Sequence, residues 1–202
     1  MTPLDVLDWR RQVHRLYADV RSSGNPCDAH ELWRVGRDAL FAEHPASPIP
    51  PERRADFAGL TYAPYLPELR HSLTVDRDVE PQRWEVESSS DGVVPFELAG
   101  VLHVPDLGDL GVWWLDSYGG GVFVPVRDAT AGRVTYGAGR YLIDTVKGAD
   151  LGGDVRDGEL VVDLNFAYNP SCAYNPLWSC PLAPPVNTVS VGLDAGELLA
   201  GS

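Results

Sequence analysis

The sequence predicts a mainly β protein of the α+β class, in which two N-terminal helices precede an antiparallel β-barrel, curled sheet or sandwich. Two observations carry this prediction. Up to about residue 44, apolar residues recur every three or four positions, which is the period of an amphipathic helix. From Gly59 onward, short segments rich in Val, Tyr, Trp and Thr are separated by clusters of Gly, Pro, Asp and Ser, a pattern typical of antiparallel β proteins.

The first helix is expected to begin directly after Thr2. A threonine at that position can cap a helix, Pro3 suits the first helical position, and Asp5 lies three residues beyond the cap. The polar stretch 22–26, which contains Gly and Pro, should end the helix. Its apolar stripe comprises Val6, Trp9, Val13, Leu16 and Val20.

A second helix is predicted to begin at Asp28, with Glu31 three residues further on, and to stop before Pro45. The proline-rich stretch 44–57 that follows is expected to be irregular. The buried face of this second helix is expected to comprise Leu32, Val35, Ala39 and Leu40.

The body of the protein is expected to be β-rich over residues 59–202, within a single domain that spans 1–202 and whose helical part is 1–44. Side chains alternate along one segment, which predicts that Asp163 and Asn165 leave the same face of a strand. The helices are expected to close one end of the sheet or to cover an edge. The segments with strand composition are residues 60–65, 69–75, 83–89, 94–104, 110–118, 121–128, 140–146, 159–168 and 188–193.

The chain is strongly acidic, with a net charge of −13 and a sequence pI of about 4.6. Such a surface repels phosphate backbones and anionic lipids, so neither nucleic acid nor a membrane is expected as a partner. No apolar run approaches the roughly 20 residues that cross a bilayer, and the N-terminal segment has no apolar signal core, which predicts a cytoplasmic protein. Nothing in the sequence indicates a cofactor, a metal site or an oligomeric state.

The three cysteines are too few for a disulfide scaffold or for a closed zinc site with four cysteine ligands. Cys172 and Cys180 bracket the turn-rich loop CAYNPLWSC, so their sulfur atoms could meet. Three interpretations stay open: two packed free thiols, a redox or disulfide pair, and a nucleophilic or metal-binding role. A nucleophile needs a base, and the histidines are far away in sequence, at His14, His30, His44, His71 and His103.

The C-terminal half contains a set of glycine-, proline- and asparagine-rich motifs: SYGGGVFVPVRDATAG (117–132), TYGAGRYLIDTVKGADLG (135–152), VVDLNFAYNPSCAYNPLWSCPLAPPVN (161–187) and AGE (195–197). In these motifs the chain resembles the domain-of-unknown-function family 1684 of bacteria and archaea. Val126 and Leu164 stand where that family usually has phenylalanine. The resemblance implies a shared fold and no particular activity. The glycines do not form a phosphate-binding loop, because no G-K-[ST] follows them.

Three polar residues of these motifs are expected to meet. Asp163 and Asn165 interrupt an otherwise apolar segment, and a buried carboxylate needs a partner. Arg140 is the motif residue expected to supply it, and the pair would either anchor a polar ligand or act as a structural ion pair that fixes strand register. Asparagines in such loops commonly shape turns, and tyrosines beside strands commonly belong to the core. The further candidates for ligand binding are Tyr118, Arg127, Asp128, Tyr136, Tyr168, Asn169 and Asn187.

The function favoured by these patterns is that of a small-molecule-binding β-domain with a polar site near the Asn-Pro-Ser-Cys-Ala loop at 169–173. One alternative is an enzyme, a hydrolase or lyase, with Asp163 as base and Arg140 as electrostatic anchor; Cys172 is a further candidate for a catalytic role. The other alternative is a structural or interaction protein without a ligand.

Overall fold

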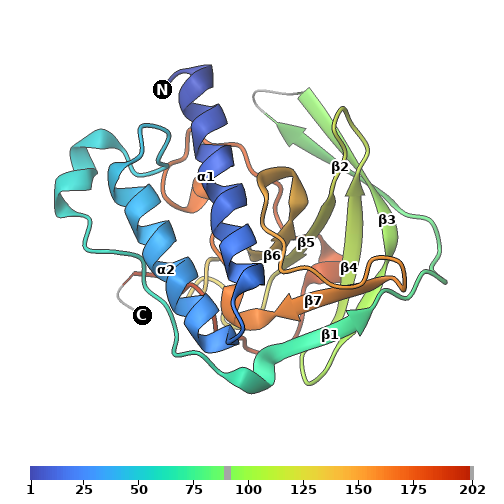
Figure 1. Ribbon diagram of the computed structural model, residues 1–202. Coiled ribbons are helices and arrows are strands. Elements are labelled where there is room, and N and C mark those ends of the chain that lie inside the picture. The colour runs from blue at the N-terminus through green and yellow to red at the C-terminus, as the bar shows by residue number, and fades with distance from the viewer. Residues whose placement is uncertain (89–91, 201–202) are drawn as a thin grey trace.

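The computed structural model describes residues 1–88 and 92–200 of the 202-residue chain, so the last residue of the predicted strand 83–89 lies outside the described residues. Two helices lie next to each other on one side of the molecule, and the strands form the other side (Figure 1). This arrangement confirms the prediction of two N-terminal helices followed by antiparallel sheets. Within the described residues, no helix has both the length and the apolar character to cross a membrane.

Helix α1 (Pro3–Ser22) begins where the sequence predicts. The side chain of Thr2 accepts a hydrogen bond from the backbone N–H of Asp5 at 3.2 Å, and the carboxylate of Asp5 accepts one from the N–H of Thr2 at 2.5 Å. This reciprocal capping satisfies two of the N–H groups that a helix start leaves without partners. Part of the predicted stripe packs inward, because Val20 is buried and Val13 and Leu16 lie against the aromatic core.

Helix α2 (Pro26–Glu43) begins before the predicted Asp28, because the side chain of Asn25 accepts a hydrogen bond from the N–H of Cys27 at 2.9 Å and caps the helix there. The predicted buried face is largely wrong. Leu32 and Val35 are 40% and 60% exposed. The helix instead turns inward the side chains of Ala29, His30, Trp33, Arg37, Leu40 and Phe41.

The main sheet has five antiparallel strands in the order β2 (Arg83–Ser88), β3 (Gly92–Val104), β4 (Gly108–Leu115), β5 (Val122–Val126) and β6 (Arg140–Asp144). A second sheet pairs β1 (Arg70–Thr74) with β7 (Glu159–Asp163). Neither sheet closes on itself within the described residues, so the barrel alternative is not confirmed. Register shifts between Leu98 and Gly100 and between Val124 and Pro125 mark irregularities of the kind that bend strands.

Two of the predicted strand segments form only isolated bridges. Tyr62 of segment 60–65 pairs with Glu197, and Thr188 of segment 188–193 pairs with Arg127. The predicted strand 159–168 is also shorter in the structure, because β7 ends at Asp163 and Leu164–Phe166 form a turn of 3₁₀ helix. Proline in the first of these segments and glycine in the second limit the ladders that they can form, and the side chain of Asp163 caps the turn that ends β7.

The core has two parts. The aliphatic part is centred on side chains from β3 to β7, including Leu102, Leu110, Val124 and Val162, which are all almost completely buried. The aromatic part lies where the helices meet the sheet: Trp33 of α2 packs on Phe166 with ring centroids 4.9 Å apart. Burial of these side chains supplies most of the free energy that orders the motif loops around them.

Candidate functional site

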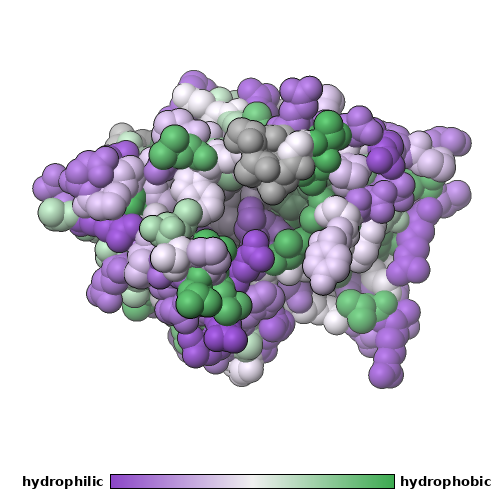
Figure 2. Space-filling view, turned by 90° about the horizontal axis from the view of Figure 1, so that it is seen from above, coloured by the Kyte–Doolittle hydropathy of each residue, from purple (hydrophilic) through white to green (hydrophobic). Residues whose placement is uncertain are grey.

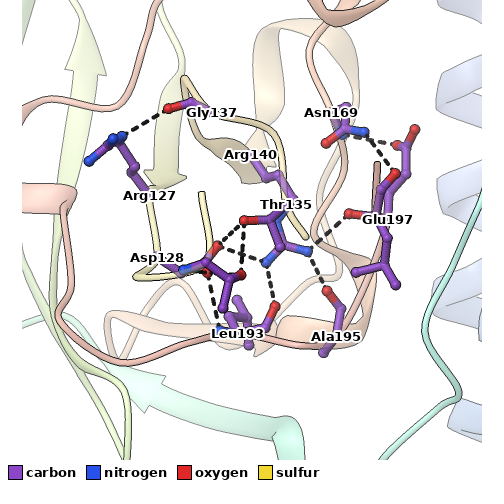
Figure 3. Close-up of polar contacts among 11 residues, drawn as sticks. Arg127, Asp128, Thr135, Gly137, Arg140, Asn169, Leu193, Ala195 and Glu197 are labelled. Carbon is purple, nitrogen blue, oxygen red and sulfur yellow. Dashed lines mark hydrogen bonds and ion pairs between the residues drawn. The ribbon is translucent and has the colours of Figure 1, made fainter. Parts of the chain in front are cut away.

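Arg140 lies at the first position of β6 and is completely buried. Its guanidinium forms an ion pair with Asp128 at 3.2 Å and donates hydrogen bonds to the carbonyl oxygens of Leu193 at 2.8 Å and Glu197 at 3.0 Å (Figure 3). It also donates to the carbonyl of Ala195. The expected pairing of Arg140 with Asp163 is therefore wrong: the loop after β5 returns to β6 and brings Asp128 into that position.

Asp128 is held by other groups of its own loop. The hydroxyl of Thr135 donates to it at 2.7 Å, and the N–H of Thr130 donates at 2.8 Å. Burial acts to raise the pKa of Asp128, but the hydrogen bonds from Thr130 and Thr135 and the charge of Arg140 outweigh burial, so the pKa is lowered. The carboxylate therefore stays ionised and neutralises Arg140. The cluster ties segment 193–197 to β6 and is sealed from solvent.

Asp163 and Asn165 do meet, although not through strand alternation. Asp163 ends β7, and its carboxylate accepts hydrogen bonds from the backbone N–H of Asn165 at 3.1 Å and from its side-chain amide at 2.8 Å. This is a turn-capping arrangement. Arg70 and Tyr65 are the other partners of Asp163, each at 3.3 Å. The amide of Asn165 also bonds the backbone of Leu66 in both directions, which fixes that segment to the end of β7.

Four other predicted site residues do not join a common site. The amide of Asn187 is buried and bonds the carbonyls of Gly111 and Pro125, as a structural link between β4 and β5. Tyr168 packs edge-to-face on Tyr141 in the aromatic core. The remaining two lie at the surface: the side chain of Arg127 donates to the carbonyl of Gly137, and that of Tyr118 is fully exposed.

Asn169 lies beside the buried carboxylate of Glu197, which the sequence motifs did not identify as a site residue. The N–H of Asn169 donates to Glu197 at 2.9 Å, and Arg37 of α2 forms an ion pair with the same carboxylate oxygen at 2.7 Å. Burial raises the pKa of Glu197, and the charge of Arg37 opposes that rise. A cavity of about 690 Å³ adjoins these residues, but the side-chain oxygen of Asn169 is shielded from it and has no partner among the described residues. The Ala-Gly-Glu motif at 195–197 is the sequence feature that could have identified Glu197 as a candidate residue.

The structure brings Cys172 and Cys180 together as free thiols. Cys172 lies in a short 3₁₀ turn (Ser171–Ala173), and its thiol is hydrogen-bonded to the sulfur of Cys180. The hydroxyl of Tyr136 lies 3.7 Å from the sulfur of Cys172. Both cysteines are half-buried, so neither side chain lies fully inside the core. Of the predicted candidates, Tyr136, Cys172 and Cys180 are the ones that form a shared, accessible group.

The surroundings favour ionisation of Cys180 before Cys172. The hydrogen bond from Cys172 lowers the pKa of Cys180 against the opposing effect of burial, and the charge of Lys147 and the backbone N–H groups of Cys172 and Ser171 lower it further. The same contact and burial raise the pKa of the Cys172 thiol. Lys147, the only lysine of the chain, also pairs with Asp144 at 3.4 Å. The surroundings therefore favour a thiolate on Cys180 over one on Cys172.

Two hollows meet at Cys180. The first, which we call the sheet cavity, has a volume of about 180 Å³; it is walled by Val86, Val94, Phe96, Leu115 and Phe123 and has Asp144, Lys147 and Cys180 at its polar end. The second, which we call the outer groove, has a volume of about 660 Å³ and is lined by both cysteines, Tyr136, Trp84 and Trp178 among others. Figure 2 shows the molecule from above, with hydrophobic and hydrophilic side chains intermixed around a hollow near its centre. Cys180 thus adjoins both an apolar cavity and an open groove.

Comparison with known proteins identifies the family of the chain but no function. The family model described as a protein of unknown function (DUF1684) matches residues 55–198. The solution NMR structure of an uncharacterised protein from Haloarcula marismortui is similar, with 36% sequence identity and a TM-score of 0.58 over 84% of this chain and 91% of that one. No curated protein matches the chain. Because the family model covers well over half of its residues, the chain belongs to the DUF1684 family of proteins of unknown function.

Proposed function

We propose that the protein binds a neutral, mainly apolar small molecule in the sheet cavity. The observation that carries the proposal is the composition of this cavity, in which apolar side chains from β2 to β5 adjoin a small group of polar residues that includes Asp144, Lys147 and Cys180. Small-molecule sites are typically lined by apolar side chains with a few convergent polar groups of shifted pKa. The sheet cavity lies next to the loop 169–173, because Cys172 of that loop and Cys180 of the cavity line the same outer groove.

The size and charge of the cavity restrict its ligand. An apolar protein cavity of roughly 150 Å³ accommodates benzene, so a cavity of about 180 Å³ has room for one ring or a short branched chain. At its polar end, the charge of Lys147 is already balanced by Asp144, and the lowered pKa of Cys180 favours a further negative charge there. An anionic ligand would therefore meet a net negative environment, whereas a neutral ligand with a hydrogen-bond acceptor can bind the Lys147 ammonium.

The enzyme alternative based on Asp163 and Arg140 receives less support. The two residues are 1% and 0% exposed, and each is paired with other protein groups. A substrate would have to displace these buried partners before it could reach either side chain, at the cost of leaving a charge unpaired. A purely structural role for these two clusters is compatible with ligand binding elsewhere in the molecule.

Benzyl alcohol tests the proposal, because it combines one ring with a neutral hydroxyl. We expect it to bind the purified protein with a Kd of about 1 mM, measured by shifts of backbone amide NMR signals. Val94→Phe should abolish this binding by filling the cavity, while Val93→Phe should not, because Val93 is the neighbouring valine on β3 and is exposed. Equal binding by the two variants, or no binding by the unmodified protein, would contradict the proposal.

A further inference from the structure

We propose that Cys180 and Cys172 reduce a small organic hydroperoxide that enters the sheet cavity, with Cys180 as the attacking sulfur and Cys172 as the sulfur that then closes a disulfide. This proposal rests on the proposed function, since the sheet cavity holds the organic part of the substrate. It adds a reaction and a substrate class to the binding site.

The position of the two sulfurs assigns their order of reaction. Cys180 adjoins both the sheet cavity and the outer groove, whereas Cys172 adjoins only the outer groove. A molecule whose ring lies against the apolar wall formed by Phe96 and Phe123 therefore presents its polar end to Cys180 first. Cys172 lies in hydrogen-bond contact behind it, where it can attack whatever forms on the Cys180 sulfur.

The charges around Cys180 suit a thiolate that reacts with a neutral molecule. Lys147 and the N–H groups of Ser171 and Cys172 stabilise negative charge on that sulfur, and thiolates rather than thiols are the nucleophiles in such reactions. Asp144 pairs with Lys147, and Glu85 and Glu87 line the outer groove, so the surroundings oppose the approach of anions. Hydroperoxides are uncharged at neutral pH and are not repelled.

The reaction balances as two steps. In the first, the Cys180 thiolate attacks the terminal oxygen of the hydroperoxide, the O–O bond breaks, and the departing alkoxide takes a proton to become an alcohol, which leaves Cys180 as a sulfenic acid. In the second, the Cys172 sulfur attacks the Cys180 sulfur, the S–O bond breaks, and hydroxide leaves as water with the Cys172 proton. The thiol pair loses two electrons to the hydroperoxide, and an external dithiol, such as dithiothreitol, returns the pair to its reduced state.

The third cysteine gives an internal reference for the test. Cys27 is free and exposed near the start of α2, so in one sample of reduced protein its oxidation reports ordinary thiol reactivity. With an equimolar amount of cumene hydroperoxide, we expect peptide mass mapping to show a Cys172–Cys180 disulfide, a loss of about 2 Da, at least about tenfold faster than any change at Cys27. Oxidation of Cys180 no faster than that of Cys27 would overturn the proposal.

Variants separate the roles of the two sulfurs. Cys172→Ser should halt the reaction at a sulfenic acid on Cys180, detected as a gain of about 16 Da and by its adduct with dimedone. Cys180→Ser should leave Cys172 as unreactive as Cys27, and Cys27→Ser should change nothing. A sulfenic acid that accumulates on Cys172 instead of Cys180 would overturn the assigned order.

The binding proposal and the thiol proposal fail in different ways. Val94→Phe should slow oxidation of Cys180 by cumene hydroperoxide by about tenfold but leave its oxidation by hydrogen peroxide unchanged, because hydrogen peroxide has no group to place in the cavity. Benzyl alcohol binding without selective oxidation of Cys180 would overturn the thiol proposal and leave the binding site standing. If the protein binds no benzyl alcohol and Val94→Phe slows neither oxidation, the cavity has no role in either proposal.

Discussion

The Arg140–Asp128 pair and the Cys172–Cys180 pair both come from motif segments of the C-terminal half, but they face different surroundings. The ion pair is sealed, and protein carbonyls and hydroxyls occupy the space around it. The thiol pair is half-buried and adjoins two hollows. The difference teaches that polar residues in a shared motif serve separate purposes: those whose hydrogen bonds end inside the protein hold the chain, and those with one side open are available to a ligand.

The largest effect should come from removing the charge of Asp128. Asp128→Asn removes the ion-pair partner of the buried Arg140, so we expect the free energy of unfolding in urea to fall by about 3–5 kcal/mol. Glu85→Gln provides the control, because Glu85 pairs with Arg83 at the exposed surface and should change stability by no more than about 0.5 kcal/mol. Similar losses in the two variants would show that the sealed ion pair has no special role.

A smaller loss is expected for Asp163→Asn. Arg70, its cationic partner, is one-third exposed and can turn to water, and the asparagine still offers an oxygen to the N–H of Asn165. We therefore expect the free energy of unfolding to fall by about 1–2 kcal/mol, measured in the same urea titrations. A loss as large as that of Asp128→Asn would mean that Arg70 is held as rigidly as Arg140.

The smallest effect concerns the pH dependence of the thiol pair. Because the pKa of Cys180 is lowered, its thiolate forms as the pH rises through a value below the roughly 8.5 of a free cysteine, so alkylation by iodoacetamide should begin at lower pH than for a free cysteine in a model peptide. Lys147→Met should raise the midpoint of this pH profile by up to about one unit. Arg77→Met, which removes a cation beside Gly158, should leave the midpoint unchanged. An unaltered midpoint in Lys147→Met would assign the lowered pKa to the hydrogen bond from Cys172 alone.

Local sequence patterns predict the parts of the fold that depend on neighbouring residues. The start of α1 follows from Thr2, Pro3 and Asp5, which interact with each other. The buried face of α2 could not be found in this way, because Arg37 is buried through an ion pair with Glu197, which lies 160 positions further along the chain. Hydropathy predicts that an arginine is exposed to solvent. The burial of Arg37 follows from its distant partner Glu197, which hydropathy does not take into account.

The candidate site shows the same division. Asp163 and Asn165 are two residues apart, so their contact was predicted correctly even though a turn, and not strand alternation, produces it. The partner of Arg140 was predicted wrongly, since the path of the loop between β5 and β6 decides which carboxylate arrives there. The apolar wall of the sheet cavity comes from four separate strands, and no spacing in the sequence indicates that they enclose a space next to Cys180.

The ion pair between Arg37 and Glu197 has a consequence for biosynthesis. At translation rates of about 5–20 residues per second, the 160 positions between the two residues correspond to roughly 8–32 s. During that interval α2 has left the ribosome with a guanidinium whose carboxylate partner does not yet exist. Burial of an unpaired charge is costly, so the inner face of α2 stays hydrated until the segment around residue 197 emerges. The inner face of α2 therefore docks with its ion pair complete only after all the strands have been synthesised.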